Sequence, residues 1–114
     1  YGPYDKFDLE RSHVFGATMT KIAQALKEKR AEITVWGEGK ELRDLLHVDD
    51  LTSFIDLALT KQNVPYFLCN VGQGEGISIN DLVRTMQQEM GGALELRHDL
   101  SKPSIPVDIV LNSQ

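Results

Sequence analysis

Apolar residues recur at helical spacing in three segments of the chain, and this pattern predicts three helices. We expect them at about residues 13–30, 49–62 and 78–90. Asp49 or Asp50 is the expected N-cap of the second helix, because a short polar side chain can accept a hydrogen bond from the first turn. Each helix is expected to turn one apolar stripe toward a core. On the second helix this stripe consists of Leu51, Phe54, Ile55, Ala58 and Leu59.

Short extended runs lie between and after these helices. Runs rich in β-branched and aromatic residues at 33–36, 42–48, 66–71, 94–97 and 107–111 are typical of strands, and the run at 66–71 is the most strand-like. The order α-β-β-α-β-α-β-β predicts one small mixed α/β domain. It lacks the full alternation of strands and helices that builds an independent doubly wound sheet.

Composition and charge exclude several classes of partner. The 114 residues carry a formal net charge of -5 and are 41% hydrophobic and 25% charged, as in an ordinary globular domain. We expect neither nucleic acid nor a membrane as a partner, because no long basic or apolar run is present. The single Cys69 fits a reducing cytoplasm. Lys21, on the polar side of the first expected helix, can face water.

The glycine-rich loop Gly72–Gly76 imitates a dinucleotide-binding fingerprint, with Glu95 about 20 residues further on. The spacing fails, because the third glycine is needed where Ile77 stands. A plain turn between a strand and a helix is therefore favoured over a small dinucleotide-binding unit. Ser78 and Asp81 follow as an S-x-x-D pattern, which predicts that Ser78 caps the third helix.

Arg43 is the strongest candidate for binding an anion, because a guanidinium offers forked donors that match a diphosphate and stays charged. Trp36, seven residues earlier across a glycine turn, could stack on a ring. By residue type alone, a surface ion pair of Arg43 with Asp44 or Asp49 is the commoner arrangement. Lys102 could supply a second cation or be a solvated loop lysine.

His13 lies at the start of the first expected helix, where the helix dipole favours a neutral imidazole that could serve as a general acid. A plain polar residue of the first turn is the alternative. His47 is expected to be a hydrogen-bonded core histidine and His98 to be exposed. No metal-ligand spacing is present, and we expect no metal site.

Several motifs together resemble the extended short-chain dehydrogenase/reductases that act on nucleotide sugars, the NAD-dependent epimerase/dehydratase family. The GDP-L-fucose synthase branch is the most similar. The motifs occur in the order of that family and span nearly the whole chain. They are Tyr1-Gly2-Pro3, Ser12-His13-Val14, Val35-Trp36-Gly37-x-Gly39, Arg43-Asp44-Leu45-Leu46-His47-Val48-Asp49-Asp50, Asn70-Val71-Gly72-x-Gly74, Ile79-Asn80-Asp81-Leu82 and Ser101-Lys102-Pro103.

The resemblance implies specific roles for residues of this chain. His13 matches the proposed catalytic acid, and Gly2 and Pro3 match the segment that passes the nicotinamide. The positions of Val14, Trp36 and Arg43 match the sugar-nucleotide pocket, with Arg43 on the phosphates. Lys102 is added to this substrate-binding set. His47 and Asp49 match structural positions, with Asp49 capping its helix.

The cofactor loop and the Tyr-x-x-x-Lys pair of the family are absent from residues 1–114. We therefore expect the C-terminal, substrate-binding lobe of a longer enzyme. In this parent, NAD or NADP is the cofactor, residues near 66–90 complete the cofactor domain, and the assembly is a homodimer. The isolated chain is expected to be inactive and to bind neither cofactor tightly. A stand-alone, non-catalytic module that binds a sugar nucleotide or a protein is the alternative.

The chain departs from the fucose synthase pattern near its end. Where that pattern carries basic residues facing the nucleotide, this chain has Val107 and Asp108. An aspartate at that position would repel a phosphate. The base of the nucleotide sugar is therefore left open.

Overall fold

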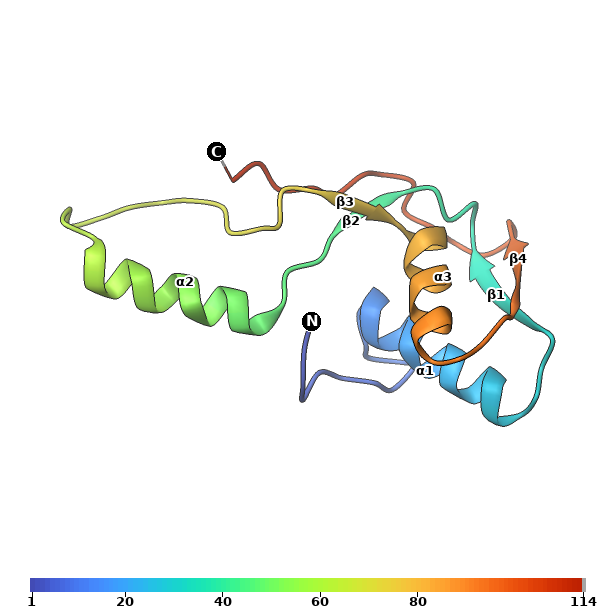
Figure 1. Cartoon of the computed structure of the whole chain (residues 1–114). Coiled ribbons are helices and arrows are strands. Elements are labelled where there is room, and N and C mark those ends of the chain that lie inside the picture. The colour runs from blue at the N-terminus through green and yellow to red at the C-terminus, as the bar shows by residue number, and fades with distance from the viewer. Residues whose placement is uncertain (114) are drawn as a thin grey trace.

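The computed structural model describes residues 1–113 as three helices and four short strands (Figure 1). The helices are α1 (Val14–Lys27), α2 (Val48–Lys61) and α3 (Ile79–Glu89). The strands are β1 (Glu32–Trp36), β2 (Leu42–Asp44), β3 (Gly76–Ser78) and β4 (Glu95–Asp99). The three predicted helices are confirmed, each within three residues of its expected ends.

The strands form two separate two-stranded sheets. Strand β1 pairs in parallel with β4, in a register that runs from Glu32 opposite Glu95 to Trp36 opposite Asp99. Strand β2 pairs antiparallel with β3, and a single parallel bridge joins Arg43 to Ile109. The predicted strand at 107–111 is thus reduced to one bridge. The expected mixed α/β architecture, without a doubly wound sheet of its own, is what the described residues form.

The core lies where α1 and α3 pack against β1. Its buried side chains are Ile22 and Ala25 from α1, Ile33 and Val35 from β1, Ile79, Leu82, Val83 and Met86 from α3, and Leu94. Gln87 is buried beside them, and its amide satisfies both backbone groups of Leu94, with Nε2 donating to the carbonyl at 3.1 Å and Oε1 accepting from the N–H at 2.8 Å. This pairing fixes the chain between α3 and β4, and it satisfies both the buried Gln87 amide and the backbone of Leu94.

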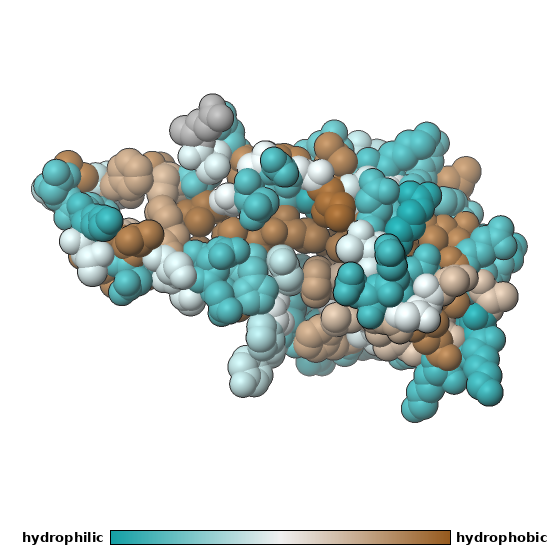
Figure 2. Space-filling model, in the orientation of Figure 1, coloured by the Kyte–Doolittle hydropathy of each residue, from teal (hydrophilic) through white to brown (hydrophobic). Residues whose placement is uncertain are grey.

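Helix α2 and the segment after it project away from this core (Figure 1). No residue of α2 is buried, and Leu59 on its apolar stripe is 81% exposed. The expectation that this stripe faces a core was wrong for the described chain. The predicted strand at 66–71 was also wrong, since these residues form no strand and most are exposed. Hydrophobic residues therefore reach the surface over this arm (Figure 2).

The helix ends follow local capping chemistry. Ser78 caps α3 as predicted, and its hydroxyl oxygen accepts from the backbone N–H of Asp81 at 3.1 Å. Helix α2 is capped by His47 instead of an aspartate, because His47 Nδ1 accepts from the N–H of Asp49 at 3.2 Å. The predicted capping role of Asp49 or Asp50 was therefore wrong. None of the helices in residues 1–113 has the length and apolarity to cross a bilayer.

Candidate functional site

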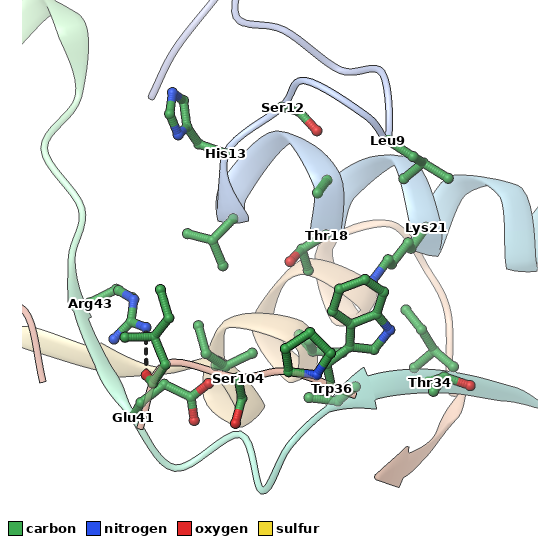
Figure 3. A pocket seen from close by; sticks show the side chains of 18 residues that line it. Leu9, Ser12, His13, Thr18, Lys21, Thr34, Trp36, Glu41, Arg43 and Ser104 are labelled. Carbon is green, nitrogen blue, oxygen red and sulfur yellow. Dashed lines mark hydrogen bonds between the residues drawn. The ribbon is translucent and has the colours of Figure 1, made fainter. Parts of the chain in front are cut away.

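A cleft of about 680 Å³ lies between α1, β1 and the segment at 103–105 (Figure 3). Helix α1 forms one wall with Val14, Ala17, Thr18 and Lys21, which lie on one helical face because their spacing is three or four residues. The floor is apolar and belongs to the core, with Ile33, Val35, Ile79 and Val83. The opposite wall comes from Thr34, Trp36, Glu41, Arg43 and residues 103–105.

Trp36 presents an aromatic face at this cleft and is 48% exposed. Lys21 Nζ lies 4.9 Å from the centre of its ring, and Lys102 Nζ lies 5.9 Å from it. Both distances are within the range of cation–π attraction. Lys21 is partly buried, and this burial lowers the pKa of its amine. Lys21 is partly exposed, and it lines the cleft beside Trp36.

Arg43 is held by three backbone carbonyls. Its Nη1 donates to Leu42 O at 2.8 Å and to Val107 O at 2.7 Å, and its Nη2 donates to Ile105 O at 3.1 Å. These acceptors are neutral, so the guanidinium is oriented without an ion pair, and the Glu41 carboxylate lines the same cleft. No ion pair of Arg43 with an aspartate occurs within residues 1–113, so the alternative of a surface ion pair is not the arrangement found.

His13 lies at the junction between this cleft and a second groove of about 410 Å³. The second groove contains Gly2 and Pro3, and His13 and Val14 line both spaces. His13 is the N-cap of α1, but its side chain makes no capping bond and is exposed. Gly2 is needed for close packing, because a Cβ there would come within 2.6 Å of Val48 Cγ1.

The structure thus brings His13, Val14, Trp36 and Arg43, four of the candidate residues, to one cleft. Lys102 does not line the cleft, although its amine reaches the Trp36 ring. Lys21 and Thr18 were missed. Their signal was the shared helical face with Val14, but that face becomes a cleft wall only when residues 103–105 cross in front of it.

The glycine loop at 72–76 has no free phosphate cradle. Asp44 Oδ1 accepts from Gln73 N at 2.8 Å, and its Oδ2 accepts from Gly74 N at 3.1 Å and from Leu111 N at 3.2 Å. Partial burial alone would raise the pKa of Asp44, but these three backbone donors together lower it. This arrangement agrees with the prediction of a plain turn, which was favoured over a dinucleotide-binding unit at this loop.

The other polar candidates serve the scaffold. Asp108 Oδ1 accepts from Leu42 N at 2.8 Å, which fixes the segment after residue 105 against β2. His98 is exposed as expected, with Nε2 lying 2.8 Å from Asn80 Oδ1. His47 is half-buried at a helix cap instead of in the core. Across residues 1–113, no three His, Cys, Asp or Glu side chains gather as metal ligands would.

Comparison with curated proteins finds relatives among GDP-sugar enzymes. The probable GDP-L-fucose synthase 1 of Oryza sativa subsp. japonica is 36% identical over 103 residues, which is 90% of this chain and 31% of that protein. This chain thus spans about a third of the length of the relative. The predicted resemblance to the GDP-L-fucose synthase branch is confirmed.

Comparison with solved structures confirms the fold class. A GDP-L-fucose synthetase from Naegleria fowleri bound to NADP matches with a TM-score of 0.75 and 26% identity, over 91% of this chain and 32% of that one. A GDP-6-OMe-4-keto-L-xylo-heptose reductase from C. jejuni matches with a TM-score of 0.80 and 21% identity, over 99% of this chain and 43% of that one. The second likeness shows the fold alone.

A sequence model of the NAD dependent epimerase/dehydratase family matches residues 1–72, more than half of the chain. This match covers α1, β1, β2 and α2, and it includes the cleft residues that α1, β1 and β2 supply. The chain therefore belongs to the NAD dependent epimerase/dehydratase family.

Proposed function

We propose that the cleft binds a nucleotide-diphosphate sugar and that the chain is the substrate-binding lobe of a longer epimerase, reductase or dehydratase. The observation that carries this proposal is the joint presence of a cation held without a counter-charge, Arg43, and an exposed aromatic ring, Trp36, in one cleft. A diphosphate needs the first group and a nucleobase can use the second. The GDP-sugar names of the relatives agree with this ligand class.

The positions of the side chains support one direction for the proposed ligand. Arg43 and Trp36 lie toward different ends of the cleft (Figure 3). We place the diphosphate at Arg43, the base near Trp36, Lys21 and Lys102, and the sugar toward His13 and Val14. This direction puts the sugar at the junction with the groove of Gly2 and Pro3, where the two spaces share His13.

The groove of Gly2 and Pro3 fits the edge of a nicotinamide cofactor but not the whole of it. Gly2 packs closely against Val48, and the backbone N–H groups of Gln73 and Gly74 are already bonded to Asp44 and are not free to bind a diphosphate. A bound NAD or NADP would supply the hydride, and a cofactor domain outside this chain would hold its diphosphate. Residues near 66–90 would complete that domain, and the parent enzyme is expected to be a homodimer.

Within this chain, His13 is the proton donor of the proposal. Its side chain has no hydrogen-bond partner among residues 1–113 and faces the junction of the two spaces. An imidazole placed there can give a proton to a sugar carbon or to a carbonyl oxygen. Val14, beside it, would present an apolar surface to the sugar ring.

The direct test is the substitution Arg43→Ala in the full-length protein that contains this chain. Loss of a charge-assisted contact should weaken GDP-L-fucose binding by about 1.5–3 kcal/mol, measured by calorimetric titration. Arg84→Ala is the matched control, because Arg84 is exposed on α3 and pairs with Asp81 outside the cleft. Equal affinity of the Arg43→Ala variant and the wild type would overturn the assignment of this cleft.

A further inference from the structure

The cleft contains one carboxylate, that of Glu41. It is the only acidic side chain among the described residues that line this space, which also holds the cations Arg43 and Lys21. Glu41 makes no ion pair within residues 1–113, and Lys40 next to it is paired with Glu38 at 2.8 Å. The residue is half-buried, so water can satisfy its carboxylate when no ligand is bound. Its charge and its place are therefore the features that need an explanation.

The backbone around Glu41 is fixed by hydrogen bonds to other elements. Its carbonyl accepts from Ile79 N at 3.3 Å, at the start of α3, and the next residue, Leu42, donates its N–H to Asp108 Oδ1 at 2.8 Å. Glu41 stands directly before β2 and two residues before Arg43, so the two side chains share one face of the extended chain. Their Cα atoms are therefore roughly 7 Å apart along that chain.

The sign of this charge is wrong for a diphosphate at Arg43, which Glu41 would repel. An ionised carboxylate only accepts hydrogen bonds, so it needs donors from another part of the ligand. In Figure 3, Glu41 and Ser104 lie on the wall of the cleft between Arg43 and Trp36. The ribose of a nucleotide joins the diphosphate to the base. With the diphosphate at Arg43 and the base near Trp36, the ribose and its hydroxyl donors would pass Glu41.

We infer that Glu41 is a specificity-determining residue that accepts hydrogen bonds from the ribose 2′- and 3′-hydroxyls, so that the cleft prefers ribonucleotides to 2′-deoxyribonucleotides. This inference rests on the proposed function. The two oxygens of a carboxylate can accept from both hydroxyls of a vicinal diol. Dinucleotide-binding folds hold the ribose 2′-hydroxyl of NAD with an Asp or Glu in a similar way. These contacts would offset the repulsion of the diphosphate, and a 2′-deoxyribonucleotide lacks one of them.

The test compares GDP with 2′-deoxy-GDP in calorimetric titrations of the full-length protein. The wild type should bind GDP at least about tenfold more tightly, because hydrogen bonds to ionised groups are among the stronger ones. Glu41→Ala should weaken GDP binding and abolish this preference. Its binding of 2′-deoxy-GDP should weaken less than its binding of GDP, because repulsion of the diphosphate is relieved. Glu38→Ala is the matched control, because Glu38 is exposed on the same turn and lies outside the cleft.

The preference is a ratio measured within one variant. Partial unfolding of Glu41→Ala would weaken both ligands equally, so it cannot imitate a lost preference. Glu41→Gln keeps the shape and one acceptor oxygen, and it should retain part of the preference. A wild type that binds both nucleotides equally would overturn the inference, as would a preference that Glu41→Ala leaves unchanged.

IDP, which lacks the amino group of guanine, tests a contact with the base. If Glu41→Ala lost a preference for GDP over IDP and kept the preference over 2′-deoxy-GDP, the carboxylate would contact the base, and the assignment to the ribose would be overturned. We expect the wild type and Glu41→Ala to show the same ratio of GDP to IDP affinity.

The outcomes distinguish this inference from the proposed function. If the wild type binds GDP-L-fucose and Arg43→Ala weakens that binding, the cleft assignment stands whatever Glu41→Ala does. An unchanged preference in Glu41→Ala would then reject the role of Glu41 alone. Absence of any binding to the wild type would reject both.

Discussion

At Arg43 the charge of the cleft and the shape of the cleft depend on one side chain. The carbonyls of Ile105 and Val107 bind its guanidinium, and the same segment supplies one wall of the cleft. Because these acceptors are neutral, the guanidinium is oriented without losing its charge. Residue type alone favoured an ion pair at this position. The carbonyl contacts could not be predicted from local sequence, because residues 105–107 are about 60 residues away from Arg43 in the chain.

The role of His13 as the proposed proton donor can be tested with the substitution His13→Gln. In the full-length enzyme, steady-state kinetics with a GDP-4-keto sugar should show turnover reduced about 100-fold or more, because general acid catalysis contributes at that scale. Binding of the nucleotide sugar should change little, since Arg43 and Trp36 remain. His98→Gln, at an exposed site on β4, is the control. Full turnover by His13→Gln would reject the role of His13.

The hydrogen bonds of Asp44 should make the stability of the folded chain depend on pH. Its three backbone donors lower its pKa in the folded chain, so its stabilising contribution is complete above the ordinary carboxyl range near pH 4. That contribution is lost as the pH falls through the lowered pKa that Asp44 has in the folded state. Asp44→Asn should therefore be less stable than the wild type at pH 7, and the two should converge in acid. Chemical unfolding measured at several pH values checks this, with the exposed Asp56→Asn as control.

A difference between Asp44→Asn and the wild type that stays constant from pH 7 down to about pH 2 would contradict this account. The carboxylate would then contribute through its shape and not through its charge. The loop at 72–74 and the backbone at Leu111 are the segments expected to loosen first, because Asp44 joins them.

At the scale of elements, the turn between β1 and β2 sets the distance between Trp36 and Arg43. Gly39 has a φ of 68°, and a Cβ there would lie 2.2 Å from Asn80 Oδ1. The Asn80 amide cannot easily move, because its Nδ2 donates to Glu38 O at 2.9 Å and its Oδ1 lies 2.8 Å from His98 Nε2. The turn is therefore tied to α3 and β4.

Gly39→Ala should lower the free energy of unfolding more than Gly91→Ala does. Gly91 also has a positive φ, of 73°, but a Cβ there meets no atom within 4 Å. Gly91→Ala thus measures the conformational cost alone, about 1 kcal/mol, and the steric clash should add at least about 1 kcal/mol at Gly39. Denaturant titration of both variants measures the difference. Equal losses would mean that the turn and Asn80 adapt freely.

Local pattern was sufficient for the helices and for Ser78, because periodicity and capping depend on neighbours in sequence. It was insufficient for the run at 66–71, whose β-branched and aromatic composition predicts a strand only where another strand is present to pair with it. The same limit applies to Lys21. Its spacing placed it on a polar face, and only the crossing segment at 103–105 turns that face into a cleft wall.

At the scale of the whole molecule, the described chain exposes large apolar surfaces. Helix α2 buries no residue, and Tyr66, Phe67 and Leu68 after it are 62–81% exposed. The chain measures 55 × 26 × 24 Å, elongated by this arm. Apolar surface on this scale is typical of an interface that another domain covers. In the proposed parent enzyme, the cofactor domain would cover it.

The isolated 114-residue chain should self-associate through this arm. Sedimentation velocity at rising concentration should show a mass that increases, because apolar surface is removed from water on contact. Ile55→Lys, on the exposed stripe of α2, should shift the chain toward the monomer. Ser53→Lys, about half a turn away on the same helix, adds the same charge and should shift it less. A concentration-independent monomer of the wild type would contradict the expectation.

In the proposed function, the cleft between α1, β1 and the segment at 103–105 binds a nucleotide-diphosphate sugar through Arg43. A crystal structure of the full-length protein with GDP-L-fucose tests it most directly. We expect diphosphate oxygens within hydrogen-bond distance of the Arg43 guanidinium, with the fucose directed toward His13. A ligand bound at the loop 72–76, or anywhere that leaves Arg43 with its backbone carbonyls alone, would contradict it.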